Sequence, residues 1–123
     1  MSIGKIGAVV LDCPDPVALA RFYAELVGGT VEEVEDYGDG WVDLKGSEGA
    51  ALAFQAAPGF VPPSWPSAET SQQFHLDVTV EDLDAAEAKV LALGATVLEA
   101  EDRKRSFRVY ADPAGHPFCL CAC

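Results

Sequence analysis

Positive charge is scarce in this 123-residue sequence: eight lysine and arginine residues stand against 20 aspartate and glutamate residues, for a formal net charge of −12. Such an excess of negative charge argues against binding to the phosphate backbone of nucleic acids or to an anionic membrane, because both are themselves negatively charged. We therefore expect neither nucleic acid nor membrane as a partner. The carboxylates suit either an ordinary acidic surface or a site for a cationic ligand.

Long apolar runs are also missing. No stretch approaches the roughly 20 apolar residues that a membrane span requires, and the N-terminal segment lacks the apolar region and cleavage site of a secretory signal peptide. These absences predict a cytoplasmic protein.

The four cysteines agree with that compartment. Cys119, Cys121 and Cys123 alternate along one predicted strand and so share a face, where neighbours cannot readily bridge each other, and Cys13 lies far from them in the sequence. No second pair of thiols or histidines at zinc-finger spacing accompanies them, so we expect small buried residues rather than a zinc or iron–sulfur site.

Several catalytic motifs are absent as well. The sequence contains no G-x-S-x-G elbow, no G-x-x-x-x-G-K phosphate loop and no G-x-G-x-x-G fingerprint. Nucleophile-elbow hydrolysis, nucleotide hydrolysis and dinucleotide binding therefore have no motif behind them. A nucleophilic pair of Cys119 and His75 is conceivable, but no activating partner is visible in the sequence.

What is present is an internal repeat. In the second half, alternating and helical apolar periods predict a strand, a helix and three strands, separated by Gly94 and by a tight turn at Asp112–Gly115; the strands lie near 73–80, 95–101, 105–112 and 117–122, and the helix lies near 82–93. The first half repeats this order. Asp15 and Pro16 start its helix and Gly28 ends it, which predicts a helix near 15–28 and strands near 3–12, 30–36, 40–46 and 50–56.

The two copies predict one domain, 1–123, with repeats 3–56 and 73–122. The segment between them, 57–72, is too rich in proline for a helix or a central strand and is best explained as a crossover. The predicted fold class is α+β, with paired βαβββ modules that form a half-barrel cup. A concave apolar surface between the copies is where a small-molecule site is usually built.

Three sequence motifs carry a family resemblance: DCPDPVALARFY at the first helix, HLDVTVEDLDAAEAKVLALGA in the second copy, and YADPAGHPFCL near the end. Together they resemble the vicinal oxygen chelate superfamily, and within it the glyoxalase-like branch that is similar to bleomycin-resistance proteins. The resemblance extends from Ile6 to Cys121. It implies the glyoxalase, bleomycin resistance and dihydroxybiphenyl dioxygenase fold, and a homodimer.

The resemblance also implies where a metal would bind. Metal-dependent members hold one divalent ion through a histidine or glutamine on the first strand of each half and a glutamate on the last strand of each half. In the second half these positions fall on His75, which matches, and on Cys119, which does not.

The first-half positions match still less well. They fall on Ala8, or Val9 in a gapless alignment, and on Phe54, with Gln55 if the register slips by one. One ligand in four is kept, so we expect no family-type metal and no other cofactor. A softer metal held by His75 and Cys119, with His116 from the turn, is the alternative.

These positions define a predicted ligand site in the cup. His75 and Cys119 should project into it, and strand alternation should send Asp77 and Cys121 the same way, with Ala8 and Phe54 facing them. The full predicted lining consists of Trp41, Phe54, Trp65, His75, Asp77, Tyr110 and Cys119.

Three functions stay open at this point. The first is a protein that binds a small aromatic or cationic ligand in the cup without the family metal. The second is a lyase, isomerase or dioxygenase with a remodelled metal or Cys/His site, and the third is a ligand-free dimeric partner module. The basic cluster Arg103, Lys104, Arg105 and Arg108 is either a solvated hairpin tip or an anion-recognising rim over the pocket.

Overall fold

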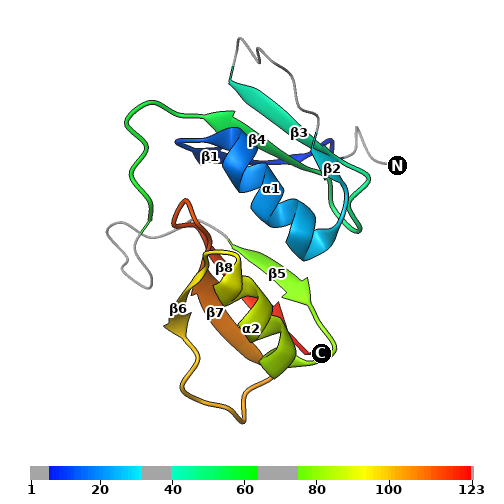
Figure 1. Ribbon diagram of the computed structural model, residues 1–123, viewed down its shortest axis with the longest axis vertical. Helices are drawn as coiled ribbons and strands as arrows, with labels where there is room; N and C mark the ends of the chain where they lie inside the picture. Colours follow the sequence, from blue (N-terminus) through cyan, green and yellow to red (C-terminus); the bar gives the residue numbers. More distant parts are fainter. Residues whose placement is uncertain (1–5, 32–39, 64–74, 123) are drawn as a thin grey trace. The chain divides into compact units, whose positions relative to one another are not determined.

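The computed structural model describes residues 6–31, 40–63 and 75–122. The chain divides into two compact units, Met1–Phe60 and Val61–Cys123. Each unit contains one strand, one helix and three further strands, in that order (Figure 1). The predicted α+β class and the repeated βαβββ order are therefore confirmed.

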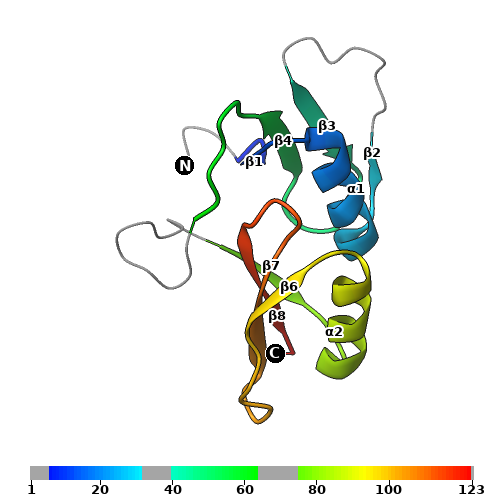
Figure 2. The same ribbon diagram turned by 60° about the vertical axis from the view of Figure 1, so that its left-hand side comes forward.

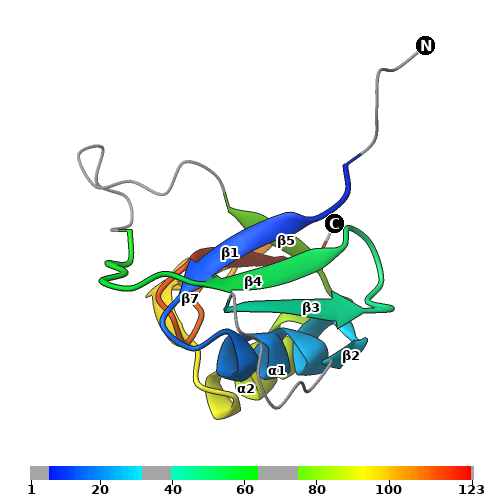
Figure 3. The ribbon, with the colours of Figure 1, turned by 90° about the horizontal axis from the view of Figure 1, so that it is seen from above.

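The first unit is a four-stranded mixed sheet with one helix on it. Its strands lie in the order β1-β4-β3-β2, with β1 parallel to β4 and the other pairs antiparallel. Figure 3 shows α1 running along one face of this sheet. The elements are β1 (Val9–Cys13), α1 (Pro16–Val27), β2 (Thr30–Val31), β3 (Trp41–Lys45) and β4 (Leu52–Ala56).

The sequence signals at both ends of α1 act as predicted. The Asp15 side chain accepts a hydrogen bond from the Ala18 backbone N–H at 3.1 Å, and Pro16 occupies the first turn, where its missing N–H costs nothing. Gly28 follows the helix with a φ of 81°, a conformation that favours glycine. Strand β1 begins at Val9, later than the predicted residue 3, and residues 6–8 are not in a strand.

The core of the first unit lies between α1 and its sheet. Phe54 is opposite Val42 on β3 and Leu11 on β1, and all three are buried. The ring of Phe54 stacks on Tyr23 of α1, with centroids 5.7 Å apart. These contacts fix which face of the sheet the helix covers.

The second unit repeats the design. Its sheet has the order β5-β8-β7-β6, again with one parallel pair, β5 and β8. Figure 2 shows α2 along one face of this sheet. The elements are β5 (Leu76–Thr79), α2 (Leu83–Ala92), β6 (Thr96–Glu99), β7 (Phe107–Ala111) and β8 (Pro117–Cys121).

Helix α2 is held to its sheet partly by polar groups. Asp82 caps its N-terminus by accepting from the Ala85 N–H at 3.1 Å. Val90 is its one fully buried residue. On the sheet side, Tyr110 donates to Glu87 of α2 at 2.9 Å, and Arg108 donates to Asp84 at 2.9 Å. Tyr110 and Arg108 therefore face the helix.

The turn between β7 and β8 is a compact polar loop. The buried carboxylate of Asp112 accepts from the N–H groups of Ala114 and His116, at 2.9 and 3.0 Å. Gly115 has a φ of 100°, and a Cβ at this position would lie 2.4 Å from Cβ of Pro62. Only glycine fits both constraints, so the predicted Asp-Pro-Ala-Gly turn is confirmed.

Residues 57–63 of the predicted crossover are described and lie outside helices and strands. The remainder of the crossover, including Trp65, lies outside the described residues. Among the described helices, neither has the length and apolar character needed to cross a membrane.

Candidate functional site

The candidate site lies on the face of the second sheet that points away from α2. Successive side chains of a strand alternate between faces, and Tyr110 and Arg108 point toward α2, so Val109 between them points away. Val109 is paired in register with Cys119, which is paired with Asp77. We call this surface the distal face and define it by His75, Asp77, Val109, Cys119 and Cys121.

Three potential ligand-binding side chains meet on the distal face. The donor atoms of His75, Asp77 and Cys119 all lie within 4.8 Å of one another. His75 Nε2 is 3.1 Å from Asp77 Oδ1, and Asp77 and Cys119 are cross-strand partners. The structure therefore brings together three of the side chains that the sequence assigned to the ligand site.

The environment keeps the Cys119 thiol protonated. Burial raises the pKa of Cys119 to about 12, and the negative charge of Asp77 and the hydrogen bond to its carboxylate act in the same direction. The group therefore combines a protonated thiol with the side chains of His75 and Asp77, and 63% of the Asp77 side chain is exposed. An exposed carboxylate beside a neutral thiol suits a hydrogen-bonding or cationic partner.

The surroundings of this cluster are apolar on one side and charged on the other. Val109, Cys119 and Cys121 form a buried cluster, with Leu98 packed against it, as expected for cysteines acting as small apolar residues. At the other end, Arg105 lies 4.1 Å above the ring of Phe107 and pairs with Glu99 at 3.7 Å. Cys123 lies outside the described residues.

Phe54 faces helix α1 of its own unit, so the prediction that it lines a ligand site was wrong. It is 0% exposed and stacks on Tyr23, in the layer between α1 and the first sheet. The exposed neighbour Gln55 occupies the opposite face of the sheet. A shift of one residue in register exchanges the two faces of a strand, which explains the error.

Tyr110 is a second correction. It is fully buried against α2, where its hydroxyl donates to Glu87. Burial, followed by the hydrogen bond and charge of Glu87, raises the pKa of Tyr110 to about 12. This side chain is a core group of the second unit and lines no surface.

Trp41 lies on the first sheet, half-buried. Its indole Nε1 donates to Asp43 Oδ1 at 2.9 Å, and Gln55 is its cross-strand partner. Since Val42 and Leu44 on the same strand are buried with Phe54 on the α1 side, Trp41 and Asp43 lie on the face away from α1. A ring beside a carboxylate can receive a cationic group.

The family's metal centre does not fit these residues. Of the first-half positions, Ala8 has no donor atom in its side chain and Phe54 is a buried ring. In the second half, Cys119 supplies a protonated thiol in place of a carboxylate. A divalent ion held by carboxylates and imidazoles from both halves therefore lacks most of its ligands.

A different donor set is nevertheless present. Among the described residues, the group with metal-binding geometry consists of His75, Asp77 and Cys119. His116 is not a member of this group; its backbone N–H donates to Asp112 in the β7–β8 turn. The sequence placed Asp77 in the ligand site through its alternation with His75, but the metal ligands considered there were His75, Cys119 and His116.

Three of the four clustered basic residues are paired within the second unit. Arg103 binds Glu87, Arg105 binds Glu99, and Arg108 binds Asp84. Burial favours the neutral form of Arg108, but its bonds to Asp84 and Tyr110 and the nearby carboxylate charges outweigh this and raise its pKa. Arg108 is buried under α2, so it belongs neither to a solvated hairpin tip nor to a rim.

Comparison with known folds agrees with this description. The chain resembles a glyoxalase/bleomycin resistance protein/dioxygenase family enzyme from Burkholderia phytofirmans PsJN, with 20% identity, a TM-score of 0.69, and coverage of 95% of this chain and 97% of that one. It also resembles the trypanothione-dependent glyoxalase I of Leishmania major, with 17% identity, a TM-score of 0.68, and coverage of 97% and 86%.

A third similar structure is TnmS3, an antibiotic binding protein from Streptomyces sp. CB03234, with 19% identity, a TM-score of 0.59, and coverage of 99% and 98%. At these identities the likeness concerns the fold. A search of curated proteins finds no match. Residues 8–121 match the model of the glyoxalase-like domain. The chain therefore belongs to the glyoxalase-like domain family, within the vicinal oxygen chelate superfamily.

Proposed function

We propose that this protein binds a small aromatic or cationic organic ligand on the distal face of its second sheet, without a family-type metal ion. The observation that carries the proposal is the cluster of His75, Asp77 and Cys119, in which a protonated thiol stands where a metal-binding carboxylate would be needed. Such a cluster can accept a ligand N–H at the exposed carboxylate of Asp77.

The charge of the protein supports the same ligand class. A net charge of −12 raises the local concentration of cations near its surface. One protein of the same fold, TnmS3, is an antibiotic binding protein, which is a precedent for ligand binding on this fold. The buried cysteines Cys13, Cys119 and Cys121 are reduced in the described residues and fit a reducing, cytoplasmic setting.

The test is a thermal-shift comparison in the presence of a chelator. Aromatic amines are compared with neutral aromatic compounds of the same shape. We expect the amines to raise the melting temperature and the Asp77→Asn variant to lose most of this effect, whereas Asp12→Asn, an exposed carboxylate on β1, should retain it. Equal stabilisation of both variants, or stabilisation by none of these compounds, would contradict the proposal.

A second candidate rests on the close approach of the same three side chains. His75, Asp77 and Cys119 could hold a zinc-like ion if metal binding displaced the thiol proton, as in a remodelled enzyme of the superfamily. Titration with Co²⁺ distinguishes metal binding by these three side chains from metal-free binding of an organic ligand. A sulfur-to-cobalt absorption band that disappears in Cys119→Ser would favour this candidate over metal-free binding.

A further inference from the structure

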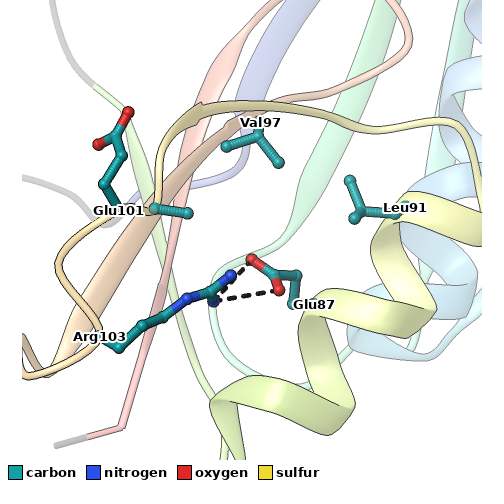
Figure 4. A pocket seen from close by; sticks show the side chains of 6 residues that line it. Glu87, Leu91, Val97, Glu101 and Arg103 are labelled. Atoms are coloured by element: carbon teal, nitrogen blue, oxygen red, sulfur yellow. Dashed lines mark hydrogen bonds and ion pairs between the residues drawn. The ribbon is translucent and has the colours of Figure 1, made fainter.

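We propose that the hollow between helix α2 and strand β6 binds a small carboxylate with an apolar tail, at a site separate from the distal face. The hollow has a volume of about 320 Å³ and is lined by Glu87, Leu91, Val97, Ala100, Glu101 and Arg103 (Figure 4). This volume is at the lower end of the range of roughly 300–1,000 Å³ for small-molecule sites. All six residues belong to the second unit.

One side of the hollow is apolar. Leu91 from α2 and Val97 from β6 point into it from two elements (Figure 4), and Ala100 also lines it. Leu91 is 40% exposed and Val97 is 47% exposed, which is high for large apolar side chains on adjacent elements. An apolar tail placed here removes their surface, and its own, from water.

The other side carries an accessible guanidinium. Arg103 donates from Nη1 to both oxygens of Glu87, at 3.2 and 3.1 Å. The Arg103 side chain is 54% exposed but that of Glu87 only 16%, so a ligand in the hollow reaches the arginine first. Figure 4 shows the carboxylate of Glu101 pointing away from this pair. A planar carboxylate is the partner that matches a guanidinium best.

Glu87 can release Arg103 without losing all its partners. It also accepts from the Tyr110 hydroxyl at 2.9 Å, and Arg108 Nη1 lies 3.7 Å from its Oε2. Arg108 is 3% exposed, and within the described part of the chain its Nε and Nη1 find no hydrogen-bond acceptor. Buried donors left without acceptors are unfavourable.

These contacts favour an exchange of partners. When a ligand carboxylate binds Arg103, Glu87 can move closer to Arg108 Nη1 and supply the hydrogen bond that this buried group lacks. An ammonium ligand has no such advantage, because it would compete with two arginines for Glu87. The hollow therefore selects anions, in contrast to the acidic character of the whole chain.

The experiment is an NMR titration of the ¹⁵N-labelled protein with octanoate, octanol and octylamine, which share one tail and differ in charge. We expect octanoate to produce saturable shifts of the Leu91, Val97 and Ala100 amides with a Kd of about 1–10 mM. Octanol should bind more weakly, and octylamine should not saturate these shifts. Octylamine binding as tightly as octanoate, or no saturable shift up to about 100 mM octanoate, overturns the site.

Two variants identify the anion-binding group. Arg103→Gln should weaken octanoate binding about tenfold, the effect of losing one charge-assisted pair. Arg105→Gln removes the same charge from the same segment, where the arginine pairs with Glu99, and should leave the affinity unchanged. Equal effects of the two variants would show that only general charge matters and would overturn the assignment. Neither result depends on a ligand at the distal face.

Discussion

Phe54 is the residue whose role changes most between sequence and structure. Because it fills the layer between α1 and the first sheet, Phe54→Ala should lower the free energy of unfolding by about 3–5 kcal/mol through lost burial and a residual cavity. Chemical denaturation measures this loss. Phe107→Ala is the matched control, since this ring is 36% exposed, and should cost about 1 kcal/mol. Similar losses in both variants would contradict the core position of Phe54.

Cys119 should resist alkylation at mild pH. With a pKa of about 12, only about one thiol in ten thousand is ionised at pH 8, and the rate with iodoacetamide should rise about tenfold per pH unit up to that pKa. Asp77→Asn removes a negative charge that raises the pKa, so the variant should react several-fold faster at the same pH. Peptide mass spectrometry follows the reaction at each cysteine.

The control for this prediction is Asp12→Asn, which changes an exposed carboxylate on β1 of the first unit. Its Cys119 should react at the rate of the unmodified protein. If Asp77→Asn also leaves the rate unchanged, Asp77 does not control the thiol.

At the level of elements, the β7–β8 turn offers a test of close packing. Gly115→Ala combines a positive φ with an approach of 2.4 Å to Pro62, and it should cost about 2–3 kcal/mol. Gly46→Ala has a φ of 76° and no atom within 4 Å, so it should cost only the backbone strain, about 1 kcal/mol. Urea denaturation of both variants isolates the contribution of Pro62. Equal losses of unfolding free energy in the two variants would mean that Pro62 moves aside at no cost.

Helices and turns that are bounded by capping residues, proline or glycine could be predicted from the sequence. Where a strand is buried on both faces, the sequence could not show which side chains point to which face. Asp15, Pro16 and Gly28 delimit α1 by simple backbone chemistry. By contrast, Leu52, Ala53 and Phe54 are all buried, as are the last four residues of β7, Arg108–Ala111. A strand buried on both faces has no alternation from which to tell the faces apart.

The same difference between alternating and doubly buried strands explains which site residues could be placed from the sequence. Asp77 lies on the edge strand β5, where exposed and half-buried residues alternate, and His75 directly precedes this strand, so their common face could be predicted. Tyr110 could not be placed in this way, and its partner Glu87 lies 23 positions earlier on a helix. Ion pairs between a helix and a strand depend on tertiary packing, which local sequence patterns do not encode.

For the whole molecule we predict a homodimer at micromolar concentration. Each four-stranded sheet ends in two edge strands, β1 and β2 in one and β5 and β6 in the other, and unpaired edges favour association. Light scattering should give twice the mass of one chain. Because each chain carries a net charge of −12, added salt should strengthen the dimer by screening repulsion. A monomer mass at all salt concentrations would contradict the prediction.

The attachment of α2 determines which part of the protein opens first. Helix α1 buries five side chains, whereas α2 buries only Val90 and depends otherwise on contacts such as those of Arg108 with Asp84 and Glu87. Local opening of α2 should therefore require less free energy than opening of α1. In hydrogen–deuterium exchange the α2 amides should exchange sooner, and more so at high salt, which weakens the partly exposed ion pair at Asp84. The two copies of one structural plan would then differ in kinetic protection, with α2 admitting solvent before α1.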